Sequence, residues 1–165
     1  MEKGAVTASY GLEPSEAIDV LQTALATEIV CVLRYTANAA AAMGINSSEV
    51  KAEFEQHANE ELMHMRKIAD RINELGGTPN LNPEGLLGRS HSQYSEGPDL
   101  IDMIKENLIA ERIAIESYTE MIRYFGDKDP TTRVMLEGIL TQEEEHASDM
   151  HDLLVAREGR PMLRR

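Results

Sequence analysis

The feature that most constrains this chain is a set of four long apolar stripes with helical spacing, each interrupted by a glutamate. In residues 15–43, apolar side chains recur at alternating steps of three and four residues, which is the period of one helix face. The same period runs through residues 47–75, 98–125 and 130–157. The composition, 42% hydrophobic but only 4% aromatic, also favours helix over sheet. The sequence therefore predicts four amphipathic helices.

The connections between these helices indicate how they are arranged. Short loops join the first two helices and the last two, so each pair is expected to form an antiparallel hairpin. Between the pairs lies a long segment rich in glycine, proline, serine and asparagine, which can run the whole length of a helix when extended. We predict an all-α four-helix bundle with one long crossover between its second and third helices, as a single domain over residues 1–165.

Every predicted helix carries a glutamate at mid-length within its apolar stripe, and two of these are followed three residues later by histidine. Residues three apart on a helix share one face. The six residues are Glu28, Glu61, His64, Glu111, Glu143 and His146. Buried carboxylates must be protonated, paired or bound to metal. Four carboxylates and two imidazoles suit two adjacent divalent cations, with two of the glutamates acting as bridges.

A simpler interpretation of each motif on its own stays open. A single Glu-x-x-His on a helix usually marks a solvated face, and the acidic run at residues 143–145 is by itself most simply a solvated surface. Arginine could neutralise buried glutamates, but Arg34 and Arg112 are expected beside the stripes rather than on them. The joint pattern in four helices favours a dinuclear metal site over a non-catalytic helical bundle.

The segments that carry these residues resemble bacterioferritins and their Dps-like relatives in the ferritin-like superfamily. The resemblance covers roughly residues 15–157, through the stretches LATEIVCVLRYTANA, NEELMHMRKIADRINELGGTPN, LIAERIAIESYTEMI and ILTQEEEHASDM. It implies the ferritin-like bundle and a ferroxidase that binds two irons per chain. Such a protein oxidises Fe(II) with O₂ or H₂O₂ and stores or detoxifies the iron in a protein shell.

The resemblance also assigns roles within the six residues. It implies Glu28 and Glu111 as terminal ligands, Glu61 and Glu143 as bridges, and His64 and His146 as the ligands that complete the two metals. Tyr35, two turns after Glu28, matches the family's tyrosine beside the centre, where a redox role and an ordinary core position are both open. His57 could act as an inner-surface iron relay. The haem-binding methionine of bacterioferritins is replaced by Leu62, so haem is not expected.

Charge and cysteine content limit the partners and the alternatives. The formal net charge of −13 argues against nucleic acid and anionic membranes as partners. There is neither a signal peptide nor an apolar run of membrane-spanning length, so a cytoplasmic protein is expected. The main alternative is a peroxide-removing di-iron or di-manganese enzyme of rubrerythrin or catalase type. A rubrerythrin normally adds a CxxC pair, which a chain with Cys31 as its single cysteine cannot supply.

The resemblance further implies a homo-oligomer. Larger shells in these families carry a fifth helix, whereas only RPMLRR remains here after Gly159. A Dps-like dodecamer is therefore expected, with a two-fold dimer as the alternative. Within the crossover, NPEGLLGRS is expected to form a turn of helix that serves a dimer interface through Leu86 and Leu87.

Overall fold

A computed structural model describes residues 4–44, 47–95 and 97–158 of the chain. Its elements are α1 (Pro14–Ala41), α2 (Ser48–Glu74), α3 (Leu86–Arg89), α4 (Leu100–Phe125) and α5 (Pro130–Glu158). No strand occurs among the described residues, and none of the described helices is long and apolar enough to cross a membrane. The predicted all-α four-helix bundle is confirmed, and every end of the four long helices lies within two residues of its predicted position.

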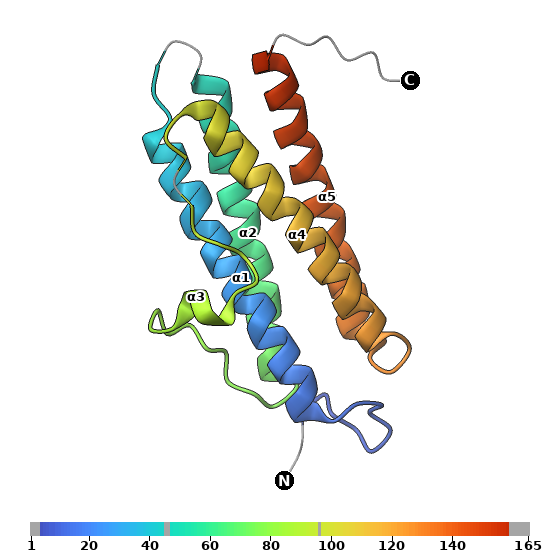
Figure 1. Ribbon diagram of the computed structural model, residues 1–165. Coiled ribbons are helices and arrows are strands. Elements are labelled where there is room, and N and C mark those ends of the chain that lie inside the picture. The colour runs from blue at the N-terminus through green and yellow to red at the C-terminus, as the bar shows by residue number, and fades with distance from the viewer. Residues whose placement is uncertain (1–3, 45–46, 96, 159–165) are drawn as a thin grey trace, which may run out of the picture.

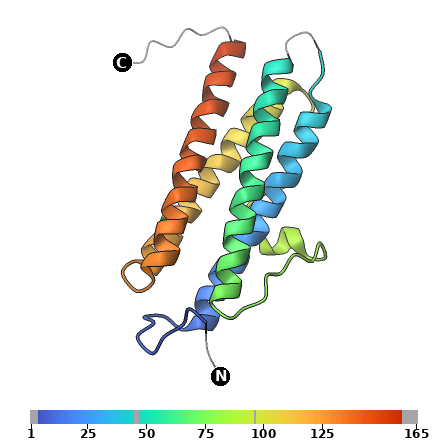
Figure 2. The ribbon, with the colours of Figure 1, turned by 180° about the vertical axis from the view of Figure 1, so that it is seen from behind.

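The four long helices form two antiparallel hairpins joined by the long crossover (Figure 1). α1 and α2 make the first hairpin, and α4 and α5 make the second. The crossover returns the chain along α1, so that α4 begins at the same end of the bundle as α2 and runs in the same direction. The view from behind shows α2 and α5 on the face opposite the crossover (Figure 2).

Local signals fix where the helices begin and end. Pro14 occupies the first turn of α1, where its missing N–H removes no helical hydrogen bond. The Asp99 carboxylate caps α4 by accepting a hydrogen bond from the backbone N–H of Asp102 at 2.9 Å. Gly76, just after α2, has a φ of +89°, a conformation that favours glycine and stops the helix.

The apolar core consists of two clusters stacked along the bundle. The lower cluster, at the end of the bundle where α2 and α4 finish, includes Leu21, Leu25, Ile68, Ile72, Phe125, Leu136 and Ile139. The upper cluster includes Tyr35, Val50, Phe54, Ile104, Leu108 and Met150. Each long helix contributes to both clusters and passes between them at mid-length. The mid-length glutamates and histidines therefore form a polar layer enclosed by apolar packing on both sides.

The turn of helix predicted within the crossover is present as α3. Its Leu86 is buried against Ala26 and Val30 of α1, so this side chain anchors the crossover within the chain. Leu87 is 59% exposed. The expectation that both leucines serve a dimer interface is therefore wrong for Leu86, which already has its packing partners. The RPMLRR tail lies outside the described residues.

Candidate metal centre

The structure brings all six predicted side chains together in the polar layer, each at most 1% exposed. Their potential ligand atoms form two groups, within each of which all atoms lie within 4.8 Å of one another. The first position is made by Glu28, Glu61, His64 and Glu143. The second position is made by Glu61, Glu111, Glu143 and His146. Both positions share the same two carboxylates, which is the geometry of two adjacent cations with two bridging glutamates.

The Nδ1 atom of each histidine points at the carboxylates. His64 Nδ1 lies 3.4 Å from Glu28, 3.2 Å from Glu61 and 3.0 Å from Glu143. In the other position, His146 Nδ1 lies 3.5 Å from Glu61, and 3.9 Å and 3.8 Å from the carboxylates of Glu111 and Glu143. Each imidazole thus faces one unshared and two shared carboxylates.

The outer nitrogen of each histidine has its own partner. His64 Nε2 lies 2.8 Å from the side-chain oxygen of Gln142, and His146 Nε2 lies 2.7 Å from the carboxylate of Glu60. Both partners are acceptors in this pairing, so a neutral imidazole carries its proton on Nε2. That tautomer leaves the Nδ1 lone pair directed into the polar layer, as a metal ligand requires.

Two buried tyrosines hold the unshared glutamates. The Tyr35 hydroxyl donates to Glu111 Oε1, and the Tyr118 hydroxyl donates to Glu28 Oε1. Tyr35 is predicted beside the centre from the sequence, whereas Tyr118 is not. The signal for it was available, because each tyrosine follows a stripe glutamate on its own helix by seven residues. Each hydroxyl fixes one carboxylate oxygen and leaves the other for a cation.

Burial and mutual repulsion set the protonation of the cluster. Burial, with repulsion from Glu61, raises the pKa of Glu28 to about 8 and raises the pKa of Glu111 and Glu143 above the usual range. Glu61 differs: burial alone would raise its pKa, but the two histidines beside its carboxylate hold that pKa below its ordinary value. Burial is likewise outweighed at His146, whose pKa rises to about 9 beside these carboxylates.

Several buried atoms in the polar layer have no hydrogen-bond partner among the described residues. They are Glu28 Oε2, Glu61 Oε1, Glu111 Oε2, both carboxylate oxygens of Glu143, and His146 Nδ1. Buried polar atoms without partners are rare in folded proteins. All of these atoms belong to residues of the two ligand groups. A mixed set of carboxylate oxygens and imidazole nitrogens suits divalent transition metals, so the residues present fit a dinuclear metal centre.

Comparison with known proteins places this arrangement in a family. Residues 18–158 match the ferritin-like domain family, "Ferritin". The chain belongs to the ferritin-like family. It is 35% identical to a bacterioferritin-related protein of Bacteroides fragilis, described as a dodecameric thioferritin, whose structure covers 90% of this chain and 91% of its own with a TM-score of 0.85.

Two further relatives are a DNA protection during starvation protein and a bacterioferritin. The DNA protection during starvation protein of Pyrococcus furiosus is 29% identical over 89% of this chain and 81% of its own length. The bacterioferritin of Desulfovibrio desulfuricans is 25% identical over 80% of this chain and 70% of its own. A solved structure of bacterioferritin from that species, with a di-iron site, has the same fold, with a TM-score of 0.78 at 22% identity over 88% of this chain and 82% of its own.

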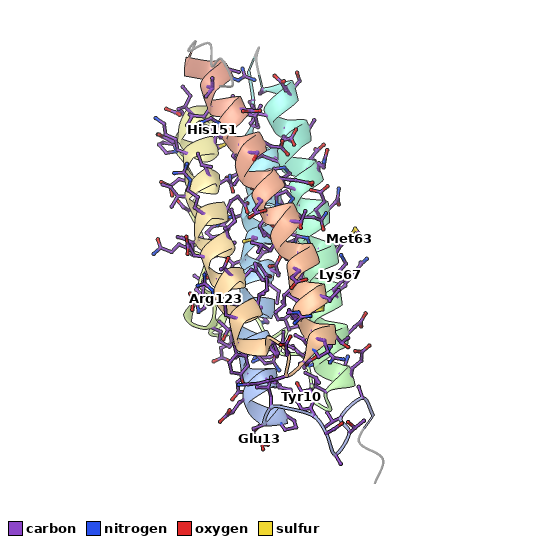
Figure 3. All side chains as sticks on the ribbon, turned by 90° about the vertical axis from the view of Figure 1, so that its right-hand side faces the viewer. Tyr10, Glu13, Met63, Lys67, Arg123 and His151 are labelled. Carbon is purple, nitrogen blue, oxygen red and sulfur yellow. The ribbon has the colours of Figure 1, made fainter. Side chains whose placement is uncertain are left out.

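His57 lies beside the centre of this ferritin-like chain without joining it. The buried His57 ring stacks on His146 with 4.0 Å between ring centroids, and its Nε2 faces Glu53 at 3.2 Å and Asp149 at 3.4 Å. An acidic pocket of about 210 Å³ between α2 and α5 is lined in part by these two carboxylates. Met63, by contrast, is 54% exposed and points away from the bundle (Figure 3).

Arg34 is expected beside the apolar stripe of α1, and the structure also buries it there, with only 1% of the residue exposed. Its guanidinium donates to the side chain of Asn107 on α4 and to Ser92 in the crossover. The crossover covers this flank of α1, which the pattern of a single helix does not reveal. Arg112, which is also expected beside a stripe, is exposed.

Proposed function

We propose that this protein is a ferroxidase that binds two Fe(II) ions per chain and oxidises them to Fe(III). The observation that carries the proposal is the sharing of Glu61 and Glu143 by both ligand groups. Shared carboxylates hold two cations close together, which suits an oxidant that accepts two electrons. Membership of the ferritin-like family supports iron as the metal that the protein handles.

Each residue has a defined part in this proposal. Glu28 and Glu111 each bind one Fe(II), with their second oxygen held by a tyrosine. Glu61 and Glu143 bind both ions. The two histidines complete the set through Nδ1, oriented by the acceptors at Nε2. The protons that these groups carry in the metal-free state leave as Fe(II) binds, because only the deprotonated groups act as ligands.

The redox step balances with either oxidant. Two Fe(II) ions lose one electron each, and H₂O₂ accepts both with two protons to give two water molecules. With O₂, the same two electrons and two protons give H₂O₂. The chain supplies the fixed separation of the two ions and the negative charge that favours Fe(III) over Fe(II).

The acidic pocket beside His57 provides a route by which Fe(II) reaches the centre. Carboxylates attract divalent cations, and the pocket contains Glu49, Glu53, Asp149 and Asp152. His57 lies between this pocket and His146. We propose that this ring relays ions inward, in line with the relay considered from the sequence.

We further propose that twelve chains form a shell around the oxidised iron. A single bundle encloses no storage cavity, and identical subunits usually assemble with closed symmetry. The Bacteroides fragilis relative is a dodecamer and spans nearly the same length of chain. Light scattering of the purified protein should give a mass near twelve chains. A stable dimer would remove storage from the proposal and leave the iron chemistry intact.

Rapid mixing tests the ferroxidase directly. The protein is loaded anaerobically with two Fe(II) per chain and mixed with O₂ or H₂O₂ in separate runs. Glu61→Ala should abolish the fast phase, because it removes a ligand of both ions. Glu144→Ala is the matched control, since this glutamate is exposed on α5 and should leave the rate unchanged. Oxidation at the wild-type rate in Glu61→Ala, with its helicity intact, would overturn the assignment.

A further inference from the structure

The two halves of the centre are related by an internal repeat, which makes their differences visible. In α1 and again in α4, a tyrosine follows the stripe glutamate by seven residues. The residue before that tyrosine differs between the halves. Arg34 precedes Tyr35, whereas Ser117 precedes Tyr118. Only one half of an otherwise repeated centre therefore has a permanent positive charge at this position.

The charge of Arg34 is buried among neutral partners. Its guanidinium donates to Asn107 Oδ1 at 2.8 Å, Ser92 Oγ at 2.7 Å, the Gln93 carbonyl at 3.1 Å and Cys31 Sγ at 3.6 Å. Among the described residues, no carboxylate lies within ion-pair distance of it. An arginine cannot lose its proton in a protein interior. A buried charge without a direct counterion needs compensation from anions farther away.

The anions of the metal centre supply that compensation, chiefly on the side of Glu111. The guanidinium carbon of Arg34 lies 5.7 Å from the centre of the Tyr35 ring, within the range of a cation–π contact. The hydroxyl of the same ring donates to Glu111. Arg34, Tyr35 and Glu111 thus form one continuous contact chain into the second position.

We propose that Arg34 makes the two metal positions unequal, so that a divalent cation fills the first position, at Glu28 and His64, before the second, at Glu111 and His146. The inference rests on the proposed dinuclear centre. Arg34 touches neither ion; it is a positioning residue that acts through Tyr35 and through its charge. Repulsion between this fixed charge and an incoming cation weakens the second position, while the first has only the neutral Ser117 in its place.

One other charge acts on the second position in the opposite direction. Glu60 accepts the hydrogen bond of His146 Nε2, whereas the equivalent acceptor in the first position is the neutral Gln142. A carboxylate partner strengthens an imidazole ligand. The Glu60 side chain is 26% exposed, however, so water screens it, while Arg34 is 1% exposed. Charges interact more strongly in the low-dielectric interior, so the effect of Arg34 is the larger.

The test uses the assembled full chain and Zn²⁺ as a redox-inert probe. Crystals are grown with one Zn²⁺ per chain, and anomalous scattering gives the occupancy of each position. In the wild type we expect the occupancy of the first position to exceed that of the second by roughly tenfold or more, because one buried positive charge repels a divalent ion from the second position. Arg34→Gln should bring the two occupancies close to equality. Arg34→Lys keeps the charge and should keep the preference.

Arg112→Gln provides the matched control, because it removes an arginine next to Glu111 in sequence that is exposed to water. It should retain the wild-type ratio. Equal occupancy in the wild type, or a preference for the second position, would overturn the inference and leave the dinuclear centre standing. So would an unchanged ratio in Arg34→Gln. The wild-type measurement decides the question even if that variant does not fold. Zinc at neither position would overturn the metal centre, and with it both proposals.

Discussion

Replacing Glu28 by glutamine separates the energetic cost of the metal-free centre from its affinity for metal. Glu28 is 1% exposed, and burial with repulsion from Glu61 raises its pKa from 4.5 to about 8. At pH 7 the folded chain keeps a proton on this carboxyl that the unfolded chain has lost. That difference lowers the free energy of unfolding by about 3 kcal/mol at pH 7.

Glutamine keeps the shape of the side chain and an oxygen for the Tyr118 hydroxyl, but it has no proton to lose. Metal-free Glu28→Gln should therefore be more stable than the wild type by up to about 3 kcal/mol at pH 7, a rise in Tm of roughly 6–12 °C for a chain of this size. The sign of the pH dependence follows from the raised folded-state pKa. The wild type loses stability as the pH rises from 4.5 to about 8, so the advantage of the variant should grow across that window and vanish below it.

Metal should narrow the difference in stability between the two proteins. A ligand present at a hundred times its dissociation constant stabilises the folded state by about 2.7 kcal/mol. Zn²⁺ should therefore raise the Tm of the wild type clearly, and raise that of Glu28→Gln less, because the first position has lost a charged ligand. Calorimetry with EDTA and with Zn²⁺ measures both effects. The exposed Glu144→Gln should behave as the wild type does, within about 0.5 kcal/mol. A metal-free Glu28→Gln that melts below the wild type at pH 7, or an equal Zn²⁺ effect on both, would refute this reasoning.

Three further outcomes are expected. Asp129→Asn should lower the free energy of unfolding by about 3 kcal/mol, because it leaves the buried Arg71 short of a counterion. Hydrogen bonds from Thr132 lower the pKa of Asp129 despite its burial, so the stabilisation by this carboxylate is present above pH 3.8. Chemical denaturation should show the stability deficit of the variant fading as the pH falls below that value. Tyr118→Phe should weaken Zn²⁺ binding in titration calorimetry by roughly tenfold, because it frees the Glu28 carboxylate to rotate. Protein purified from haem-replete cells should show no strong Soret band, because Leu62 replaces the methionine that binds haem in bacterioferritins. A stoichiometric haem would contradict this.

The convergence of the six side chains could be expected from the sequence because it depends on helix geometry alone. A helical stripe fixes which residues share a face, and Glu61 and His64 are one turn apart whatever the neighbouring helices do. Two hairpins that bury their stripes must then bring the mid-length residues to one level. That the ligand atoms form two groups sharing two carboxylates depends on packing distances, which only the structure supplies.

The residues around the centre were harder to foresee, for two different reasons. Tyr118 repeats the spacing of Tyr35 from its glutamate, so a comparison of the two halves would have found it. Arg34 carries no such signal. Its burial depends on the path of the crossover, where Ser92 and the Gln93 carbonyl accept its hydrogen bonds. The path of a long irregular segment follows from tertiary contacts, such as that of Leu86 with α1, rather than from periodicity.

The layered core explains how a fold can keep so many unpaired polar atoms at its centre. The stabilising apolar burial lies in the lower and upper clusters, on either side of the polar layer. Each long helix is held at both ends by these clusters, so the carboxylates cannot move apart to relieve their repulsion. The position of Glu143 is therefore fixed by packing rather than by hydrogen bonds, and both of its carboxylate oxygens stay without hydrogen-bond partners. A centre that is strained without metal and already in place to receive it binds cations without rearrangement, which is the physical basis of preorganised affinity.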